Sequence, residues 1–406
     1  MSGFAALVTG AGLVTSAGVG LKANWEKVLA GESTAARLPD LDGLPVTMAC
    51  RVPDFSPQDF GLRDFWKWDR FTQFAVVAAR EALEQAGLTP GEWADSARVA
   101  VLIGSGAGGT ATLEAQHRAL LEDGPTAVSP LTLPMGLVNM AAGQVAIDIA
   151  ANGPCLAPVT ACAAGASAIG IGRELLRQGV ADVVVAGGAE APITPLYVSS
   201  FARMRALSRR LDDPATASRP FDAGRDGFVL GEGAGVLVLE SEEHAAARGA
   251  RALARLTGYG ASSDAHHVTS PHPEGRGAEL AMRAALDDAG LTGRDVDYVN
   301  AHGTSTPLND VTESGVISRL LGTGARVSST KGVTGHPLGA AGAIEAVYCA
   351  LAVRDGLIPP TASLTDPDPR IEVDLVRDAA HSGPVRAALS NSFGFGGQNA
   401  TLVFTP

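Results

Sequence analysis

The chain is predicted to have an α/β fold made of two related halves, and three features of the sequence support this. Two short, continuous apolar runs, Arg98 to Gly104 and Ala181 to Ala186, are typical of strands buried on both faces of a sheet. Helical patterns such as Phe71 to Ala86 lie between such runs. Alternating strand and helix signals favour an α/β chain with substantial sheet, and an internal repetition is the third feature.

The repetition consists of two pairs of similar segments. AREALEQAGL at 79–88 resembles MRAALDDAGL at 282–291, and GASAIGIGRELLRQG at 165–179 resembles GAIEAVYCALAVRDG at 342–356. Either pair alone could arise by chance, because short helices that end in glycine are common. Together they indicate two related α/β halves, joined near residues 240–255, where SEEHAAARGARA is polar and helical.

Composition limits the functions to consider. With 406 residues, 46% hydrophobic and 18% charged, the chain can bury a large core. The net charge of -12 argues against a general nucleic-acid-binding protein. The start, MSGFAALVTGAG, has no signal-peptide pattern, and no run reaches the ~18 apolar residues of a membrane helix. The four cysteines lack CxxC or metal-type spacing, so we expect a reduced, cytoplasmic protein without nucleic-acid or membrane partners.

One glycine-containing segment imitates a dinucleotide-binding loop. VTGAGLVTSAGVG at 8–20 contains Gly10 and Gly12, but the position of the third glycine is occupied by Thr15. A GxG pair alone is weak evidence. We therefore reject NAD binding.

Cys162 is the first candidate for chemistry. Leu156 to Thr160 is predicted as a strand and Ala163 to Arg177 as a helix, which places the thiol at a helix N-terminus. There the unpaired N–H groups and the helix dipole favour an anion and are expected to lower the thiol pKa. Small neighbours allow a sharp turn and leave room for a substrate. A buried structural cysteine remains the alternative.

Two histidines lie in loops where a partner for such a nucleophile is expected. His302 follows an apolar strand in YVNAHGTSTPLND, and His336 lies in the glycine-rich turn of SSTKGVTGHPLGAAGAIEA. Three histidines in polar or helical sequence are expected at the surface, namely His117, His244 and His381. Of the adjacent pair His266 and His267, one could line the site.

Four motifs in order resemble those of the β-ketoacyl-acyl carrier protein synthases, condensing enzymes of the thiolase superfamily. They are TAC at 160–162, NAHGTSTP at 300–307, TKGVTGHPLGAAGAIE at 330–345 and NSFGFGGQNA at 391–400. RPFDAGRDGFVLGEGAG at 219–235 and SSDAHHVTSP at 262–271 also fit. The likeness runs from about residue 5 to residue 404 and is greatest to the type II elongating synthases of fatty acid and polyketide assembly.

The resemblance implies a thiolase-like fold, with two halves packed as five αβαβα layers. Residues 1–250 would form the half with the nucleophile, and residues 251–406 the half with both catalytic histidines. The expected activity is decarboxylative condensation of a Cys-bound acyl group with malonyl-acyl carrier protein. The expected partners are the acyl carrier protein and either a second copy of the chain or a chain-length subunit.

The resemblance also implies roles for individual residues. Cys162 would accept the acyl group, and His302 and His336 would serve decarboxylation, supported by Lys331 and Glu345. The N–H groups of Cys162 and Phe395 would form the oxyanion hole, with Phe395 also gating the acyl pocket. The acyl pocket would be lined by Ala107 and Phe201, and the phosphopantetheine arm would be contacted by Thr304 and Thr306. A structural monovalent cation would be surrounded by Asn300, Ser390 and Asn399.

No catalytic metal and no redox cofactor are expected. Ala107 is smaller than the aliphatic residue that many fatty-acid members carry there, so we predict a roomier acyl pocket. Gln398 stands where relatives often carry Thr or His, and we assign it no consequence. Since acyl carrier proteins are acidic, a basic patch is expected at the tunnel mouth. The candidates are Lys67, Arg70, Arg203, Arg205, Arg209 and Arg210.

Three other functions compete with this one. A noncatalytic chain-length subunit would lack the nucleophile. A Cys–His hydrolase would need an Asp or Asn orienting one histidine. A thiolase acting on coenzyme A would carry a second catalytic cysteine near the C-terminus, where NSFGFGGQNA has none.

Overall fold

The computed structural model, which describes residues 4–406, contains one long sheet path that runs through both halves of the chain. Five strands of the first half have the order β6-β5-β7-β8-β1, and six of the second half have the order β13-β11-β10-β15-β16-β9. The two sets meet where β1 pairs with β9 antiparallel. The strands of this path are β1 (Ala6–Thr15), β5 (Val99–Gly104), β6 (Cys155–Leu156), β7 (Val183–Glu190), β8 (Gly233–Glu240), β9 (Ala254–Ser263), β10 (Tyr298–Asn300), β11 (Arg326–Ser328), β13 (Asp374–Leu375), β15 (Ala388–Gly394) and β16 (Gln398–Thr405).

The two sets have the same topology. In the first, β1 and β7 flank β8 antiparallel, while β5 runs parallel to β7 and β6. In the second, β9 and β15 flank β16 antiparallel, while β10 runs parallel to β15 and β11. The prediction of two related α/β halves is therefore confirmed.

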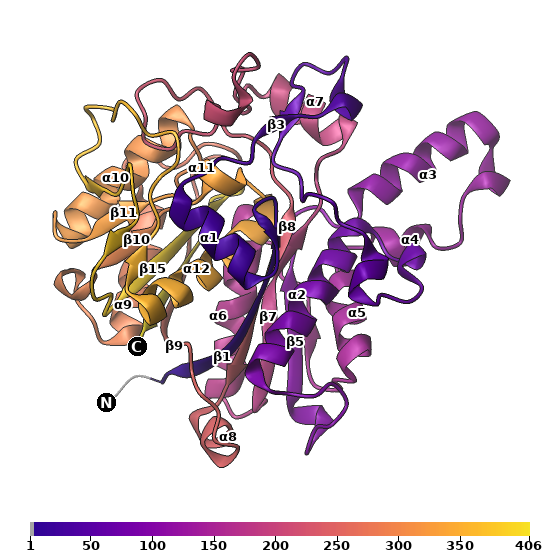
Figure 1. The fold of residues 1–406 in the computed structure, drawn as a ribbon, viewed down its shortest axis with the longest axis horizontal. Helices are drawn as coiled ribbons and strands as arrows, with labels where there is room; N and C mark the ends of the chain where they lie inside the picture. Colours follow the sequence, from indigo (N-terminus) through magenta and orange to yellow (C-terminus); the bar gives the residue numbers. More distant parts are fainter. Residues whose placement is uncertain (1–3) are drawn as a thin grey trace.

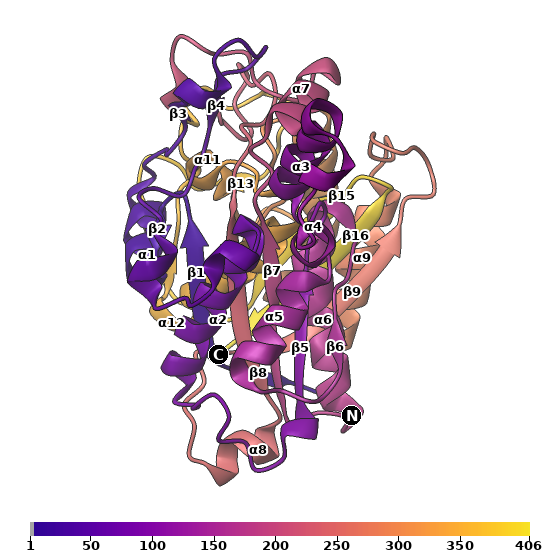
Figure 2. The same ribbon diagram turned by 90° about the vertical axis from the view of Figure 1, so that its right-hand side faces the viewer.

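The helices form the remaining layers (Figures 1 and 2). They are α1 (Leu21–Ala30), α2 (Arg70–Ala86), α3 (Thr110–Asp123), α4 (Thr132–Gly136), α5 (Met140–Ile149), α6 (Ala164–Arg177), α7 (Pro195–Arg203), α8 (Glu242–Ala247), α9 (Arg276–Ala289), α10 (Pro307–Leu321), α11 (Lys331–Thr334) and α12 (Ala341–Asp355). Short strands outside the main path are β2 (Gly18–Val19), β3 (Ala36–Arg37), β4 (Met48–Ala49), β12 (Leu357–Ile358) and β14 (His381–Ser382).

Helices α6 and α12 form the central layer between the two sheet halves. They pack against each other and against strands on both sides, and every residue of α12 from Ala341 to Val353 is buried. A helix that is apolar on all sides is expected in this environment. On the outer faces, α2 and α5 cover the first half and α9 covers the second. In Figure 1, α3 extends away from this body and the chain returns to it through α4, which lies beside α5.

The repeated sequence segments occupy equivalent places in the two halves. The first pair lies in the C-terminal parts of α2 and α9, and the second pair coincides with α6 and α12. Gly10 and Gly12, which imitate a dinucleotide-binding loop in the sequence, lie in β1. A Cβ on Gly10 would meet the Ala82 carbonyl oxygen of α2 at 2.0 Å. In the second half, a Cβ on Gly260 would meet the Ala281 carbonyl oxygen of α9 at 2.0 Å. These glycines serve close helix–strand packing in both halves.

The predicted elements are present, but their boundaries differ at β7, expected at 181–186 and observed at Val183–Glu190, and near the nucleophile. The predicted strand at 156–160 is only the two-residue β6, which pairs with β5 through Cys155 and Leu156. Pro158 lacks an N–H donor and cannot continue the ladder. The chain therefore leaves the sheet early and approaches the next helix as an irregular segment.

Candidate active site

Cys162 lies in a tight turn that leads directly into the central layer. A short 3-10 turn, η6 (Ala161–Ala163), precedes α6, and Ala161 has a φ of 48°. The corresponding turn of the second half, η9 (Leu338–Ala340), precedes α12, and Leu338 has a φ of 41°. Positive φ is uncommon for residues with a side chain, so the same strained approach to a helix occurs twice.

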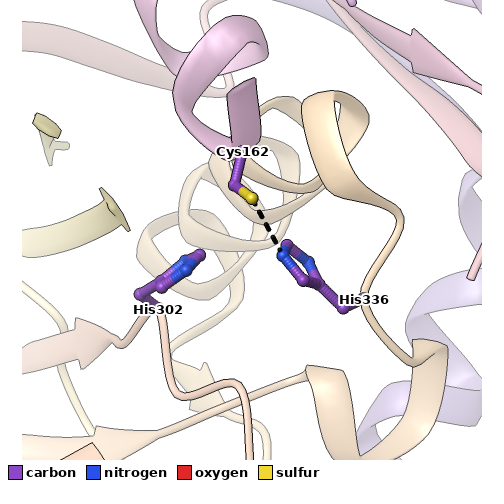
Figure 3. Close-up of side chains that lie close together, drawn as sticks. All are labelled: Cys162, His302 and His336. Carbon is purple, nitrogen blue, oxygen red and sulfur yellow. Dashed lines mark hydrogen bonds between the residues drawn. The ribbon is translucent and has the colours of Figure 1, made fainter. Parts of the chain in front are cut away.

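Three side chains from the two halves meet at this turn (Figure 3). The Sγ of Cys162 lies 3.2 Å from Nε2 of His336, and the two histidine ring centroids are 5.4 Å apart. The sulfur and one nitrogen of each ring all lie within 4.8 Å of one another. The structure therefore brings together Cys162, His302 and His336, although they are distant in sequence.

Both imidazoles are held in the neutral form. Burial lowers the pKa of His302 and of His336 well below 6.5, and the positive charge of Lys331 acts in the same direction. The Nδ1 atom of each ring is buried without a hydrogen-bond partner in the described part of the chain. A buried N–H without an acceptor is the rarer defect, so we assign the proton of each ring to Nε2. Each Nε2 then offers a donor.

The expected lowering of the Cys162 pKa is wrong. Burial raises the pKa of this thiol to about 11, although the Lys331 charge and the backbone N–H groups of Phe395 and Cys162 oppose the shift. Desolvation outweighs the helix N-terminus because the side chain is only 9% exposed. In the free structure the sulfur is therefore a thiol, with two N–H groups placed to stabilise an anion.

Lys331 and Glu345 form a buried ion pair beside this group. Their side chains are 1% and 2% exposed, and the ammonium donates to Oε1 of Glu345. Burial raises the pKa of Glu345 to about 7, with Lys331 opposing the shift. Among residues 4–406, no hydrogen bond joins Lys331 or Glu345 to either imidazole, so Lys331 acts on them through its charge.

A cavity of about 540 Å³ opens onto the sulfur and both histidines. Its lining includes all five other residues expected at the substrate: Ala107, Phe201, Thr304, Thr306 and Phe395. The aromatic rings of Phe201 and Phe395 lie 6.4 Å apart, and the two threonine hydroxyls bond each other at 2.9 Å. The sequence-predicted pocket residues thus line one cavity. His266 and His267 do not line it, although Asp264 and Thr269 of the same loop do.

Two family models together match most of the chain. Residues 6–245 match the beta-ketoacyl synthase N-terminal domain, and residues 253–365 match the C-terminal domain. The chain belongs to the beta-ketoacyl synthase family. This confirms the resemblance inferred from the motifs.

The synthase is similar both to a curated 3-oxoacyl-[acyl-carrier-protein] synthase and to ketosynthases of known structure. It is 47% identical over 405 residues to 3-oxoacyl-[acyl-carrier-protein] synthase 2 of Staphylococcus aureus, covering 98% of this chain and 100% of the relative. Among solved structures it resembles the ishigamide ketosynthase/chain length factor, with a TM-score of 0.93 and 35% identity over 99% of both chains. It also resembles a type II polyketide ketosynthase complex with its acyl-carrier protein, with a TM-score of 0.91 and 33% identity over 99% of both chains.

Two carboxylates that the sequence analysis missed support the active-site loops. Glu313, on α10, accepts hydrogen bonds from the backbone N–H groups of His302 and Gly303, both at 2.8 Å. Burial raises the pKa of Glu313 to about 7. The sequence around Glu313 does not mark this role, because Asp310 and Ser314 on the same helix are polar and buried as well. Glu190, at the end of β7, is the second such carboxylate.

Two of the three residues expected around a monovalent cation, Asn300 and Ser390, lie side by side. Asn300 faces Ser390 across β10 and β15, and the buried Oδ1 of Asn300, Oγ of Ser390 and Oε2 of Glu345 have no partner within the described residues. Oxygen donors of this kind fit a hard cation. Asn399 does not belong to this set, because its amide donates to Asp264 and Gly397.

Of the six residues expected in a basic patch, two are paired with carboxylates within residues 4–406 and four are not. Arg70 is half-buried and bound by Glu232, with Nη2 to Oε1 at 2.7 Å, and it stacks on Phe74, so its charge is already compensated. Lys67 pairs with Asp64 at 3.4 Å and does not line the cavity. Four arginines have no carboxylate within salt-bridge distance in the described chain, and Arg205 lines the cavity itself. They are Arg203, Arg205, Arg209 and Arg210.

None of the helices in residues 4–406 combines the length and the apolar character required to cross a bilayer.

Proposed function

We propose that the synthase joins a Cys162-bound acyl group to malonyl-acyl carrier protein with loss of carbon dioxide, giving a 3-oxoacyl-acyl carrier protein. One observation carries the proposal: a thiol and two neutral imidazole N–H donors share one cavity and come from separate halves of the chain. Family membership supports the same reaction class.

In the first half-reaction, the sulfur of Cys162 attacks the thioester carbon of acyl-carrier protein. A C–S bond forms to Cys162, the C–S bond to the carrier breaks, and the thiol proton ends on the departing carrier thiol. The negative charge that develops on the acyl oxygen is held by the N–H groups of Cys162 and Phe395. These two groups are the ones that already act on the sulfur, and donors aimed at developing charge stabilise it most.

In the second half-reaction, the Nε2–H groups of His302 and His336 donate to the thioester oxygen of malonyl-carrier protein. The bond to the carboxylate carbon breaks, carbon dioxide leaves, and the electron pair forms an enolate. The enolate carbon attacks the acyl-Cys162 carbonyl, the C–S bond breaks, and the thiolate of Cys162 is released and reprotonated. Each donor is worth about 3–4 kcal/mol at the transition state. The steps balance without a redox or organic cofactor.

We propose that the acyl carrier protein docks over the four unpaired arginines. A carrier is acidic, while this chain has a net charge of -12, so a local basic surface is needed for attraction. Arg205 at the cavity mouth places this surface where a phosphopantetheine arm would enter. Thr304 and Thr306, which line the cavity, are proposed to contact that arm.

A second synthase-like chain is proposed to cover the arm formed by α3 and α4. This arm extends from the body (Figure 1) and exposes large apolar side chains, namely Leu113, Leu120, Leu121, Leu133 and Leu137. Several large apolar side chains exposed on one arm are more often covered by a partner than left in water. The structural relatives include ketosynthase and chain length factor assemblies, so the second chain is a copy of this one or a sister subunit.

Three smaller assignments complete the proposal. We propose that a monovalent cation binds at the buried oxygens of Asn300 and Ser390, which face each other across β10 and β15 and have no partner among the described residues. The boundary between the two halves is placed at residue 250. The location is proposed to be cytoplasmic, because the four cysteines lack disulfide-type spacing.

The deciding experiment supplies malonyl-carrier and acyl-carrier thioesters and follows carbon dioxide and the 3-oxoacyl product. Intact-mass analysis of the protein after exposure to acyl-carrier thioester should show one acyl adduct, and Cys162→Ala should show none. A noncatalytic subunit would form neither adduct nor product, and a hydrolase would release free acid. A thiolase would turn over coenzyme A thioesters in place of carrier thioesters.

A further inference from the structure

Glu190 is a fully buried carboxylate at the end of β7 whose oxygens accept four hydrogen bonds. Oε1 accepts from the hydroxyl of Ser105 at 2.7 Å and from the N–H of Ala107 at 3.1 Å. Oε2 accepts from the N–H of Gly106 at 2.7 Å and from the N–H of Gly339 at 2.9 Å. Two donors on each oxygen are what an ionised carboxylate can accept.

These donors belong to different parts of the active site. Ser105, Gly106 and Ala107 form the loop after β5, which reaches the acyl pocket at Ala107. Gly339 lies in the second half of the chain, three residues after His336, in the turn that begins α12. One carboxylate therefore joins the pocket loop to the turn that carries His336.

The backbones around this carboxylate leave no spare space. A Cβ on Gly339 would lie 2.4 Å from the nitrogen of Gly106 and 2.6 Å from Oε2 of Glu190. A Cβ on Gly106 would lie 3.1 Å from Oε2 of Glu190 and 3.6 Å, an ordinary contact distance, from the Cα of Ala161, the residue before Cys162. The loop that Glu190 holds is therefore a neighbour of the nucleophile turn.

We propose that Glu190 is a positioning residue, which holds the acyl-pocket loop and the His336 turn in fixed relation to Cys162. The inference rests on the proposed roles of Cys162 and His336. Its chemistry requires a carboxylate, since a glutamine amide presents one acceptor and one donor where the structure offers N–H groups to both oxygens. A negative charge is also favoured at the start of α12 by the helix dipole.

Because Glu190 is charged, replacing it should change the pKa of Cys162, which a purely structural role would not affect. It raises the pKa of Cys162, whereas Lys331 and the N–H groups of Phe395 and Cys162 lower it. The neutral imidazole of His336 contacts the same sulfur. Neutralising Glu190 therefore removes one of the influences that disfavour the thiolate.

The experiment compares Glu190→Gln and Glu190→Asp in the full-length synthase. For Glu190→Gln we expect the pH midpoint of Cys162 alkylation by iodoacetamide to fall and kcat to drop about tenfold, since at least one N–H loses its acceptor. Glu190→Asp keeps the charge but is one methylene shorter and cannot reach both loops. We expect an unchanged alkylation midpoint and a ten- to hundredfold loss of kcat with little change in KM, as small misplacements of reacting groups produce.

A matched control is available in the same strand ladder. Glu240 is also fully buried and pairs with Val183 at the opposite end of β7 and β8, where it accepts from Thr9 and binds Arg248. Glu240→Gln should lower thermal stability without moving the alkylation midpoint. The proposal is overturned if Glu190→Gln has the same alkylation midpoint and the same kcat as the wild type, or if Glu190→Asp retains full kcat. Cys162→Ala, tested separately, decides the role of the nucleophile whatever the outcome for Glu190.

Discussion

Replacing His302 by alanine should separate the two half-reactions of the synthase. His302 is one of two N–H donors aimed into the cavity, while His336 makes the contact with the sulfur of Cys162. The variant removes a donor for the malonyl thioester oxygen but leaves the nucleophile, its oxyanion N–H groups and His336 in place. Decarboxylation should therefore fail while acylation of Cys162 continues.

The size of the effect follows from the number of donors. Losing one of two preorganised donors costs about 3–4 kcal/mol at the enolate-forming step, and each 1.36 kcal/mol is a factor of ten in rate. We therefore expect decarboxylation to slow by about 200- to 1000-fold. Because burial holds the pKa of the remaining ring, His336, well below 6.5, lowering the pH should not restore the lost rate.

The assay measures carbon dioxide release from malonyl-carrier protein and, separately, the acyl adduct on Cys162 by intact mass. His302→Gln, which retains an amide donor, serves as the matched control and should recover part of the rate. Thermal unfolding would reveal any loss caused only by the vacated space. The reasoning is refuted if decarboxylation falls by less than tenfold, or if acylation falls in parallel with it.

Three further predictions concern the pocket, the carrier and the thiol. Ala107→Ile should shift substrate preference toward shorter acyl chains, because Ala107 lines the cavity; an unchanged chain-length profile would contradict the assigned pocket. Arg205→Glu should raise KM for carrier thioesters several-fold at low salt with little change in kcat, and a KM indifferent to both the charge reversal and added salt would exclude the docking surface. Alkylation of Cys162 should keep accelerating as the pH rises toward about 11. Lys331→Met should slow it at fixed pH, because the removed cation favours the thiolate, and faster alkylation would show that the charge acts otherwise.

The sequence was sufficient for most of the fold because the relevant signals are local. Apolar runs marked β5 and β7, and the repeated segments marked helices that occupy equivalent layers. The three groups of the candidate site were identified for the same reason, since Cys162, His302 and His336 each lie in a turn of small residues at the end of an element. Their proximity, by contrast, came from the family resemblance.

Energies that depend on the whole environment could not be read from the sequence. The helix N-terminus at Cys162 favours the thiolate, as expected, but burial by residues distant in the chain reverses the net direction of the pKa. Arg70 looked like a surface charge next to Lys67, yet Glu232, remote in sequence, binds it. Glu190 and Glu313 were missed because a carboxylate that accepts backbone N–H groups leaves no pattern among its neighbours.

The repeated turn ahead of each central helix divides the chemistry between the two halves of the chain. Each half contributes one strained turn before a buried helix, but only the first has a thiol there. At the matching place the second half has Gly339, whose backbone packs against Gly106 in the loop after β5. The first half thus supplies the sulfur that makes the bond and the second supplies both imidazoles that stabilise charge. Neither half alone therefore holds a complete set of reacting groups.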